Sequence, residues 1–415
     1  MGNSNLQKAI LLNGIVNSMQ DFSTELKAEL NEILSYWISN TIDPIHGGFI
    51  GRIDENNLPH PEAPKGAVLN SRILWAFSSA YLLTKNEQQL ATATLAFTCL
   101  KDYFIDKKYG GVYWTVSNTG HPMDTKKQIY ALAFAMYGCC AFYTATKIDA
   151  AKKIAIDLFY TIEKYSFDKK HTGYLEAFTQ DWSPLDDLRL SVKDANEKKT
   201  MNTHLHVLEA YTALYGIWPD AKLKAQIVCL IKNFTQHIID ATTGHLQLFF
   251  EVSWKVKSTI ISYGHDIEAS WLLLEAAAII QDKKLIEALQ SLGVKISIAA
   301  AEGLDVNGGL WYELDTSTNH LIKEKHSWVQ AEAMVGFFNS WQTTNDTSFL
   351  KKSIRVWNYI KAEIKDTQHG EWFWGRNEDG TVMQEQDKVG IWKCPYHNSR
   401  ACIEIIKRIA NGQLQ

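Results

Sequence analysis

The chain has 415 residues, of which 46% are apolar and 12% aromatic, and its formal net charge at pH 7 is −4. A pI near 6.4 excludes the broad basic surface that nucleic-acid binding requires, so we expect no nucleic-acid partner. No apolar run approaches the length of a membrane span, and we expect no membrane partner. The six cysteines form no C-x-x-C pair, which favours reduced thiols and a cytoplasmic protein.

The first 20 residues are predicted to be a loose N-terminal extension. They include an apolar patch over residues 9–16 that Asn13 and Gly14 interrupt, and no convincing cleavage site follows it, so we expect no signal peptide. No Pro/Ser-rich linker or charge run divides the remainder. Residues 21–415 are therefore predicted to form one large catalytic domain, as a monomer or weak dimer.

Apolar residues recur at helical spacing in twelve segments of the chain. In the first segment Leu26, Leu30, Ile33, Leu34 and Trp37 share one stripe. The twelve predicted helices cover residues 25–40, 71–83, 89–104, 128–144, 150–165, 201–215, 221–239, 266–280, 284–301, 327–341, 349–364 and 398–409.

Between helix pairs, a short phrase recurs six times: an acidic residue, a few polar residues, a glycine, then aromatic or β-branched residues. The six copies begin at Asp43, Asp106, Asp168, Asp240, Asp305 and Asp366. Their glycines are 63, 62, 71, 65 and 61 residues apart. Aspartate and glycine favour turns and aromatic residues suit short strands, so each phrase predicts a tight β-hairpin. A period of this length indicates a repeat architecture.

Six helix pairs bury their apolar faces if the chain closes into a ring, with six helices inside and six outside. The alternative is an open superhelix of helix pairs, which needs a polar capping pair at each end. The sequence has no such pair. We therefore predict an all-α fold, an (α/α)6 barrel with short β-hairpins in its connecting loops.

Unusual polar and aromatic residues stand at the start of the helix that follows each hairpin phrase. If these helices are the inner six, they run parallel, and their N-terminal turns meet at one mouth. The residues predicted to face that mouth are Arg72, Tyr130, Asn202, His206, His265, Glu268, Trp328, Glu332, His397 and Arg400.

Helical spacing puts some of these residues on a shared face. Asn202 and His206 are four residues apart, and His265 and Glu268 are three apart. A lone helical histidine is most often a surface or packing residue, and we interpret His204 in that way. His206, His265 and His397 differ because three repeats deliver them at an equivalent position, which favours catalysis.

A metal site is the competing interpretation of the histidines and acidic residues. His265 and Glu268 could supply two ligands from one helical turn, but H-E-x-x-H and C-x-x-C patterns are absent from the sequence. We therefore predict no metal. Trp328 and Trp392 could serve as platforms for a sugar ring, and core packing is the alternative for both.

Two strings in the chain resemble signatures of the cellobiose 2-epimerases, which belong to the N-acylglucosamine 2-epimerase superfamily. They are Ser-Tyr-Gly-His-Asp-Ile-Glu-Ala at 262–269 and Trp-Lys-Cys-Pro-Tyr-His-Asn-Ser-Arg at 392–400. Shorter likenesses at 71–75, 109–114, 199–202 and 328–333 extend the resemblance over most of the chain. The family folds as an (α/α)6 barrel. Ser327 stands where family members often carry a tryptophan, which puts the preference for a second sugar in question.

The resemblance implies a cofactor-independent sugar 2-epimerase acting on a small reducing disaccharide such as cellobiose. Histidine suits the reaction because its ordinary pKa of about 6.5 allows proton transfer in both directions. By the resemblance, His265 and His397 exchange the C2 proton and Arg72 stabilises the enediolate. Glu268 orients His265 or a hydroxyl, and His206 assists ring opening. Residues lining the subsites would be Asn202, Tyr130, Trp328, Glu332 and Trp392.

Three further functions stay open at this point. The same scaffold could epimerise N-acetylglucosamine or interconvert mannose and fructose. An inverting glycoside hydrolase would need two carboxylates about 6.5–9.5 Å apart, which Glu176, Asp194, Glu268 and Glu332 could supply. A non-catalytic sugar- or partner-binding barrel would leave the histidines unexplained.

Overall fold

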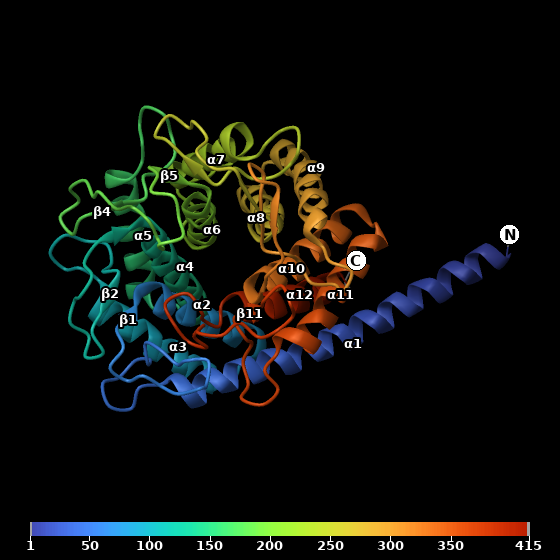
Figure 1. Ribbon diagram of the computed structural model, residues 1–415, viewed down its shortest axis with the longest axis horizontal. Coiled ribbons are helices and arrows are strands. Elements are labelled where there is room, and N and C mark those ends of the chain that lie inside the picture. Colours follow the sequence, from blue (N-terminus) through green and yellow to red (C-terminus); the bar gives the residue numbers. More distant parts are fainter. Residues whose placement is uncertain (1, 413–415) are drawn as a thin grey trace.

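A computed structural model describes residues 2–412 of the chain, with side chains from Met19 onward. Within these residues the twelve predicted helices are all present, and they alternate between an outer and an inner ring (Figure 1). The outer helices are α1 Gly2–Thr41, α3 Glu87–Cys99, α5 Asp149–Tyr165, α7 Ala221–Asn233, α9 Lys283–Ala300 and α11 Thr347–Tyr359. The inner helices are α2 Ala67–Thr84, α4 Ile129–Thr146, α6 Met201–Ile217, α8 Tyr263–Ile280, α10 Ser327–Thr344 and α12 His397–Gly412.

Residue pattern distinguishes the two rings. The inner helix α4 is apolar on all sides because it is packed on all sides, whereas the outer helix α5 buries a single stripe that includes Ala155, Leu158 and Ile162. By length and composition α4 could cross a membrane, but 67% of its 18-residue window is buried inside the protein. The apolar composition of α4 is therefore explained by its position in the core of the barrel.

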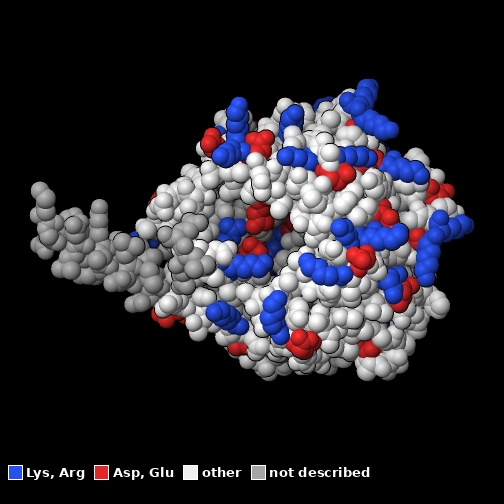
Figure 2. Space-filling view, turned by 180° about the vertical axis from the view of Figure 1, so that it is seen from behind, with Lys and Arg blue, Asp and Glu red and all other residues white. Residues whose placement is uncertain are grey.

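The ring is closed by contacts between the two ends of the chain. Helix α12 packs against both α1 and α2, and Ile53 forms an antiparallel bridge with Val389. The indole Nε1 of Trp372 donates to Glu29 at 2.7 Å, and that of Trp37 donates to Glu371 at 2.6 Å. These contacts confirm the predicted (α/α)6 barrel over the open superhelix. The space-filling view shows a hollow at the centre of the ring that contains acidic and basic side chains (Figure 2).

The predicted loose extension falls within helix α1, which starts at Gly2 rather than near residue 25. The N-terminal part of α1 projects away from the ring (Figure 1). A domain boundary at residue 20 stays a prediction.

Each hairpin phrase forms a tight turn flanked by one antiparallel bridge, such as Ile42 with Phe49. The regular strands lie outside the phrases and pair neighbouring repeats: β1 with β2, β3 with β4, β5 with β6, and β10 with β11, while β7, β8 and β9 form one sheet. Their bounds are β1 Lys65–Gly66, β2 Thr115–Val116, β3 Lys127–Gln128, β4 Ala177–Phe178, β5 Lys199–Thr200, β6 Phe249–Phe250, β7 Ile260–Ser262, β8 Glu313–Asp315, β9 His320–Ile322, β10 Lys325–His326 and β11 Gly375–Arg376.

Short non-α turns end four of the outer helices. The π-helical turns η1 Leu100–Phe104, η2 Phe234–Ile238 and η4 Ile360–Ile364 follow α3, α7 and α11, and the 3-10 turn η3 Ala301–Gly303 follows α9.

Buried ion pairs attach the hairpin turns to the starts of the inner helices. The aspartate of a phrase accepts backbone N–H bonds with one oxygen, as Asp106 does from Lys108 and Tyr109. Its other oxygen accepts from a lysine that stands two residues before an inner helix, and Lys127 Nζ lies 2.7 Å from Asp106 Oδ2. Equivalent pairs join Asp43 to Lys65, Asp168 to Lys199 and Asp305 to Lys325, and Asp366 pairs with Lys388. The pairs therefore hold the inner helices by their N-terminal ends.

Candidate active site

The N-terminal turns of the inner helices surround a cavity of about 470 Å³. Nine of the residues selected from the sequence line it: Arg72, Tyr130, Asn202, His206, His265, Glu268, Trp328, Trp392 and His397. They come from α2, α4, α6, α8, α10, α12 and the loop before α12. Glu332, which we expected on a subsite wall, lies behind His397 instead.

Carboxylates hold two of the three imidazoles. His397 Nδ1 lies 2.7 Å from Glu332 Oε1, and His206 Nδ1 lies 2.9 Å from Glu209 Oε2. A carboxylate only accepts hydrogen bonds, so Nδ1 carries the hydrogen when the ring is in its neutral form. The other nitrogen, Nε2, is then left with a free lone pair, which is the form of imidazole that removes a proton.

The third imidazole, His265, has a hydroxyl partner. Its Nδ1 lies 2.9 Å from the Oγ of Ser262, the residue that precedes α8. Burial, with nearby His206 second, lowers the pKa of His265 to about 3. Burial also lowers the pKa of His397 well below its ordinary value, and the charges of Arg72 and Arg400 act in the same direction. Both rings are therefore neutral in this state of the site at neutral pH.

One indole packs against both of these imidazoles. The Trp328 ring centroid lies 4.8 Å from that of His265 and 5.6 Å from that of His397. Trp328 thus packs against two histidines that lie more than 130 positions apart in the sequence. On another wall Tyr130 packs edge-on against both His206 and Trp392, at 5.0 and 5.9 Å.

Arg72 supplies a fixed positive charge to the cavity. It is 3% exposed, and an Nη2 hydrogen is donated to Tyr130 Oη at 2.7 Å. Its guanidinium lies 4.1 Å from the Phe134 ring centroid, and its Nε is buried without a hydrogen-bond partner among the described residues. The side-chain oxygen of Asn202 is likewise buried and without a described partner. Two residues that line the cavity, Arg72 and Asn202, therefore each keep one buried polar atom without a described hydrogen-bond partner.

Below the imidazoles, three carboxylates meet one guanidinium. Arg400 donates to Glu209, Glu268 and Glu332, and Tyr396 Oη donates to Glu209 at 2.5 Å. Burial raises the pKa of Glu268 to about 7, and the charge of Glu332 adds to the effect. Burial also favours a higher pKa for Glu209, but Arg400, His206 and Tyr396 outweigh it and lower that pKa to about 2.

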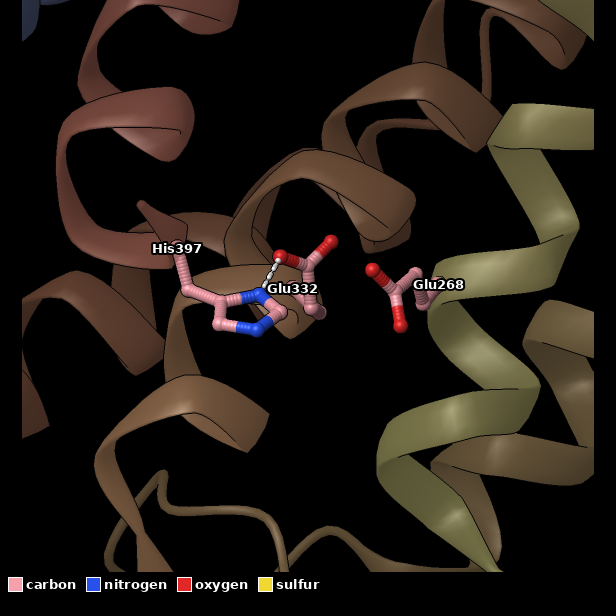
Figure 3. A group of neighbouring side chains, drawn as sticks. All are labelled: Glu268, Glu332 and His397. Carbon is pink, nitrogen blue, oxygen red and sulfur yellow. Dashed lines mark hydrogen bonds and ion pairs between the residues drawn. The ribbon is translucent and has the colours of Figure 1, made fainter. Parts of the chain in front are cut away.

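Glu268, Glu332 and His397 form the group shown in Figure 3, with the two carboxylates facing one another. Their ligand atoms lie within 4.8 Å of one another, a spacing that could hold a metal ion. Arg400 Nη2 donates to both carboxylates, so a cation would have to compete with a guanidinium already bound there. The absence of a metal stays a prediction.

Two other expectations can be compared with the structure. His204 is buried against the backbone: its Nδ1 lies 2.6 Å from Thr200 O, and its Nε2 accepts from Tyr174 N at 2.8 Å, which confirms a structural role. Glu176 lines the cavity, but both of its oxygens accept from Thr200 and Thr203 at 2.6–2.9 Å. Burial raises its pKa to about 8.

Several residues of the site were missed by the sequence interpretation. Glu209 could have been found, because it follows His206 by three residues on the same helix, as Arg400 follows His397. The cavity wall also includes Tyr312 and Glu313 and a stretch of the β4–β5 loop over residues 188–195. No periodicity marks that loop, although the 71-residue glycine interval reveals its extra length.

Comparison with known proteins gives consistent results. The N-acylglucosamine 2-epimerase (GlcNAc 2-epimerase) family model matches residues 48–401. Cellobiose 2-epimerase of Bacteroides fragilis is 49% identical over 383 residues, 92% of this chain and 98% of that protein. The Dictyoglomus turgidum cellobiose 2-epimerase is 37% identical over 92% of this chain and 99% of its own length. The solved structure of cellobiose 2-epimerase from Bacillus thermoamylovorans superposes with a TM-score of 0.89 at 38% identity, covering 94% of this chain and all of that one.

Proposed function

Because this chain belongs to the N-acylglucosamine 2-epimerase family, we propose that it is a cellobiose 2-epimerase. It would convert the reducing-end glucose of cellobiose and related β-1,4-linked disaccharides to mannose. The observation that carries the proposal is the group of three imidazoles on one cavity, with Nδ1 of each held by an oxygen. The three relatives described above, which are 37–49% identical over most of the chain, are named for this same activity.

The reaction inverts one carbon and needs a proton acceptor near each face of it. After ring opening, the C2 hydrogen is acidic because it lies next to the C1 aldehyde. An imidazole Nε2 takes that proton, and the electron pair of the C–H bond forms a cis-enediolate. The second imidazole, which must first take up a proton from solvent, returns that proton to C2 on the opposite face, so mannose forms, the first ring is left as the imidazolium and the second as the neutral imidazole. His265 and His397 both line the cavity and both pack against Trp328, which supports their assignment as this pair.

Charge develops on the C1 and C2 oxygens when the enediolate forms. A fixed cation stabilises such charge most where water is excluded and the donor needs no rearrangement. Arg72 fits this role because its buried Nε has no described partner and its Nη2 is held by Tyr130.

Ring opening needs a proton acceptor at the C1 hydroxyl and a donor at the ring oxygen. His206, with Asn202 one turn before it on α6, is proposed to act there. Tyr130, Trp328 and Trp392 would contact the sugar faces, while Glu332 acts through His397.

The hydrolase alternative is less well supported. Three of its four candidate carboxylates are engaged with side chains: Glu176 with two threonines, and Glu268 and Glu332 with Arg400. Three imidazoles on one cavity have no place in that chemistry.

Cellobiose in D2O, followed by NMR, tests the proposal. Deuterium at C2 of a new mannose unit is the expected result. Release of free glucose would indicate hydrolysis instead, and no change in cellobiose would contradict the assignment. N-acetylglucosamine and mannose serve as parallel substrates that distinguish the sister activities.

The roles of the histidines are tested by replacing each with asparagine. His265→Asn and His397→Asn should each lose most C2–H exchange, whereas His204→Asn is the matched variant of a buried histidine outside the cavity. Full exchange by either variant would remove that residue from the proton-transfer pair.

We also propose that the protein is a cytoplasmic monomer or weak dimer. The six cysteines are all free in the structure, and five of them are buried, as expected in a reducing compartment. Sedimentation velocity at several concentrations tests the oligomeric state.

A further inference from the structure

Arg400 has no part in the chemistry above, and it does not line the cavity. The side chain is 1% exposed on α12. Its guanidinium donates to a carboxylate from each of three other inner helices: Glu209 of α6, Glu268 of α8 and Glu332 of α10. One side chain therefore joins four of the six inner helices directly below the imidazoles.

Two of these carboxylates also contact an imidazole of the site, and the third lines the cavity. Glu209 Oε1 accepts a hydrogen bond from Arg400, and Glu209 Oε2 accepts one from His206 Nδ1 at 2.9 Å. Glu332 Oε1 accepts from both Arg400 Nη2 and His397 Nδ1, each at 2.7 Å. Glu268 lines the cavity itself. A shift of the guanidinium would consequently move the partners of two imidazoles together.

A guanidinium is the group that can do this. Nη1 of Arg400 donates to Glu209 and Tyr396, while Nη2 donates to Glu268 and Glu332. The guanidinium carbon lies 4.9 Å from the Trp271 ring centroid and 4.3 Å from that of Tyr396, which fixes the plane. A lysine ammonium keeps the charge but is a single point, so it cannot bridge both pairs in one plane.

We propose that Arg400 is a positioning residue for the epimerisation: it holds Glu209 and Glu332 so that His206 and His397 present Nε2 to the sugar. This proposal rests on the proposed function, because the imidazoles matter through that reaction. Replacing Arg400 should therefore change the turnover rate and the imidazole tautomers, and should leave the contacts with the sugar unchanged.

The test compares Arg400→Lys and Arg400→Gln with Arg408→Lys and Arg408→Gln. Arg408 is a matched control because it lies two turns further along α12 and also reaches α8 and α10, donating to Glu275 at 3.1 Å and to Asn339 at 2.9 Å. For Arg400→Lys, kcat on cellobiose should fall at least 100-fold. KM, and the Kd of the reduced analogue cellobiitol, should stay within about threefold. The Arg408 variants should keep kcat within about threefold.

A second measurement does not depend on turnover. In protein labelled with 15N-histidine, His206 and His397 should show the Nδ1–H tautomer, and Arg400→Lys should shift both sets of ring signals while leaving those of His204 unchanged. Glu209→Gln should shift only the His206 signals, which keeps the proposal testable if an Arg400 variant does not fold. Unchanged His206 and His397 signals would overturn it, as would a kcat loss matched by the Arg408 variants. An inactive wild-type enzyme with the expected signals would refute the function and leave the positioning role supported.

Discussion

Glu332 provides the sharpest test of how the barrel prepares an imidazole for proton transfer. Its Oε1 accepts from His397 Nδ1 at 2.7 Å, and its Oε2 accepts from Trp271 Nε1 at 3.3 Å. It is fully buried, and it is not part of the cavity wall. Substitutions here should therefore change turnover while leaving sugar binding nearly intact.

The magnitude follows from the hydrogen bond to the ring. A hydrogen bond with a charged partner contributes about 1.5–3 kcal/mol, and 1.36 kcal/mol corresponds to about tenfold in rate. Glu332→Leu removes the acceptor, so kcat should fall about 10- to 150-fold. Glu332→Gln leaves a neutral acceptor that is about half as strong, and kcat should fall only about 3- to 12-fold.

The assay is C2 deuterium incorporation from cellobiose in D2O, with kcat and KM measured separately and folding checked by near-UV circular dichroism. Glu275→Gln is the control, because Glu275 pairs with Arg408 rather than with an imidazole partner. If a folded Glu332→Leu enzyme turned over within twofold of wild type, or if Gln were more harmful than Leu, the reasoning would be refuted.

Three further predictions concern stability. Burial, followed by the charge of Glu332, raises the pKa of Glu268 to about 7, so the folded protein favours the protonated carboxyl and loses stability as the pH rises from about 4.5 to 7. The free energy of unfolding of Glu268→Gln, measured with urea, should therefore rise by about 2–3 kcal/mol relative to that of wild type when the pH is raised from about 4 to about 8. Asp106→Asn leaves the buried Lys127 ammonium unpaired and should destabilise the fold by about 3–5 kcal/mol. Asp240 has no lysine partner in the described structure, so Asp240→Asn should cost under about 1 kcal/mol. Chemical denaturation of the two variants compares these losses. His204→Phe removes the acceptor of Tyr174 N–H and should cost about 1–3 kcal/mol in thermal unfolding, with kcat unchanged.

The repeated phrase made the barrel predictable. Aspartate and glycine are needed at fixed places in each turn, and Gly173 illustrates why: its φ is 76°, and a Cβ there would lie 2.7 Å from His204 Nε2. Local requirements of this kind are written directly in the residue order. The period they mark placed Arg72, His206, His265 and His397 near the starts of inner helices, which is why those side chains could be selected before the structure was known.

The carboxylates under the imidazoles were harder to predict. Glu332 shares a helical face with Trp328, which suggested a place on the cavity wall. Its actual position behind His397 depends on how α10 is rotated against α12, and that rotation is set by packing across the ring. The contribution of the β4–β5 loop to the cavity was equally hard to predict from the sequence, because it depends on where the loop folds over the mouth.

The sequence alone therefore determined the number and order of the helices, the turns that join them and the set of polar side chains at one end of the barrel, since all of these follow from short-range spacing. The tertiary structure decided which atoms of those side chains meet. Arg400 contacts Glu209 from 191 positions away, and Glu332 from 68. Such contacts exist only once the ring has closed, because closure sets the helix rotations and burial that bring the charges together.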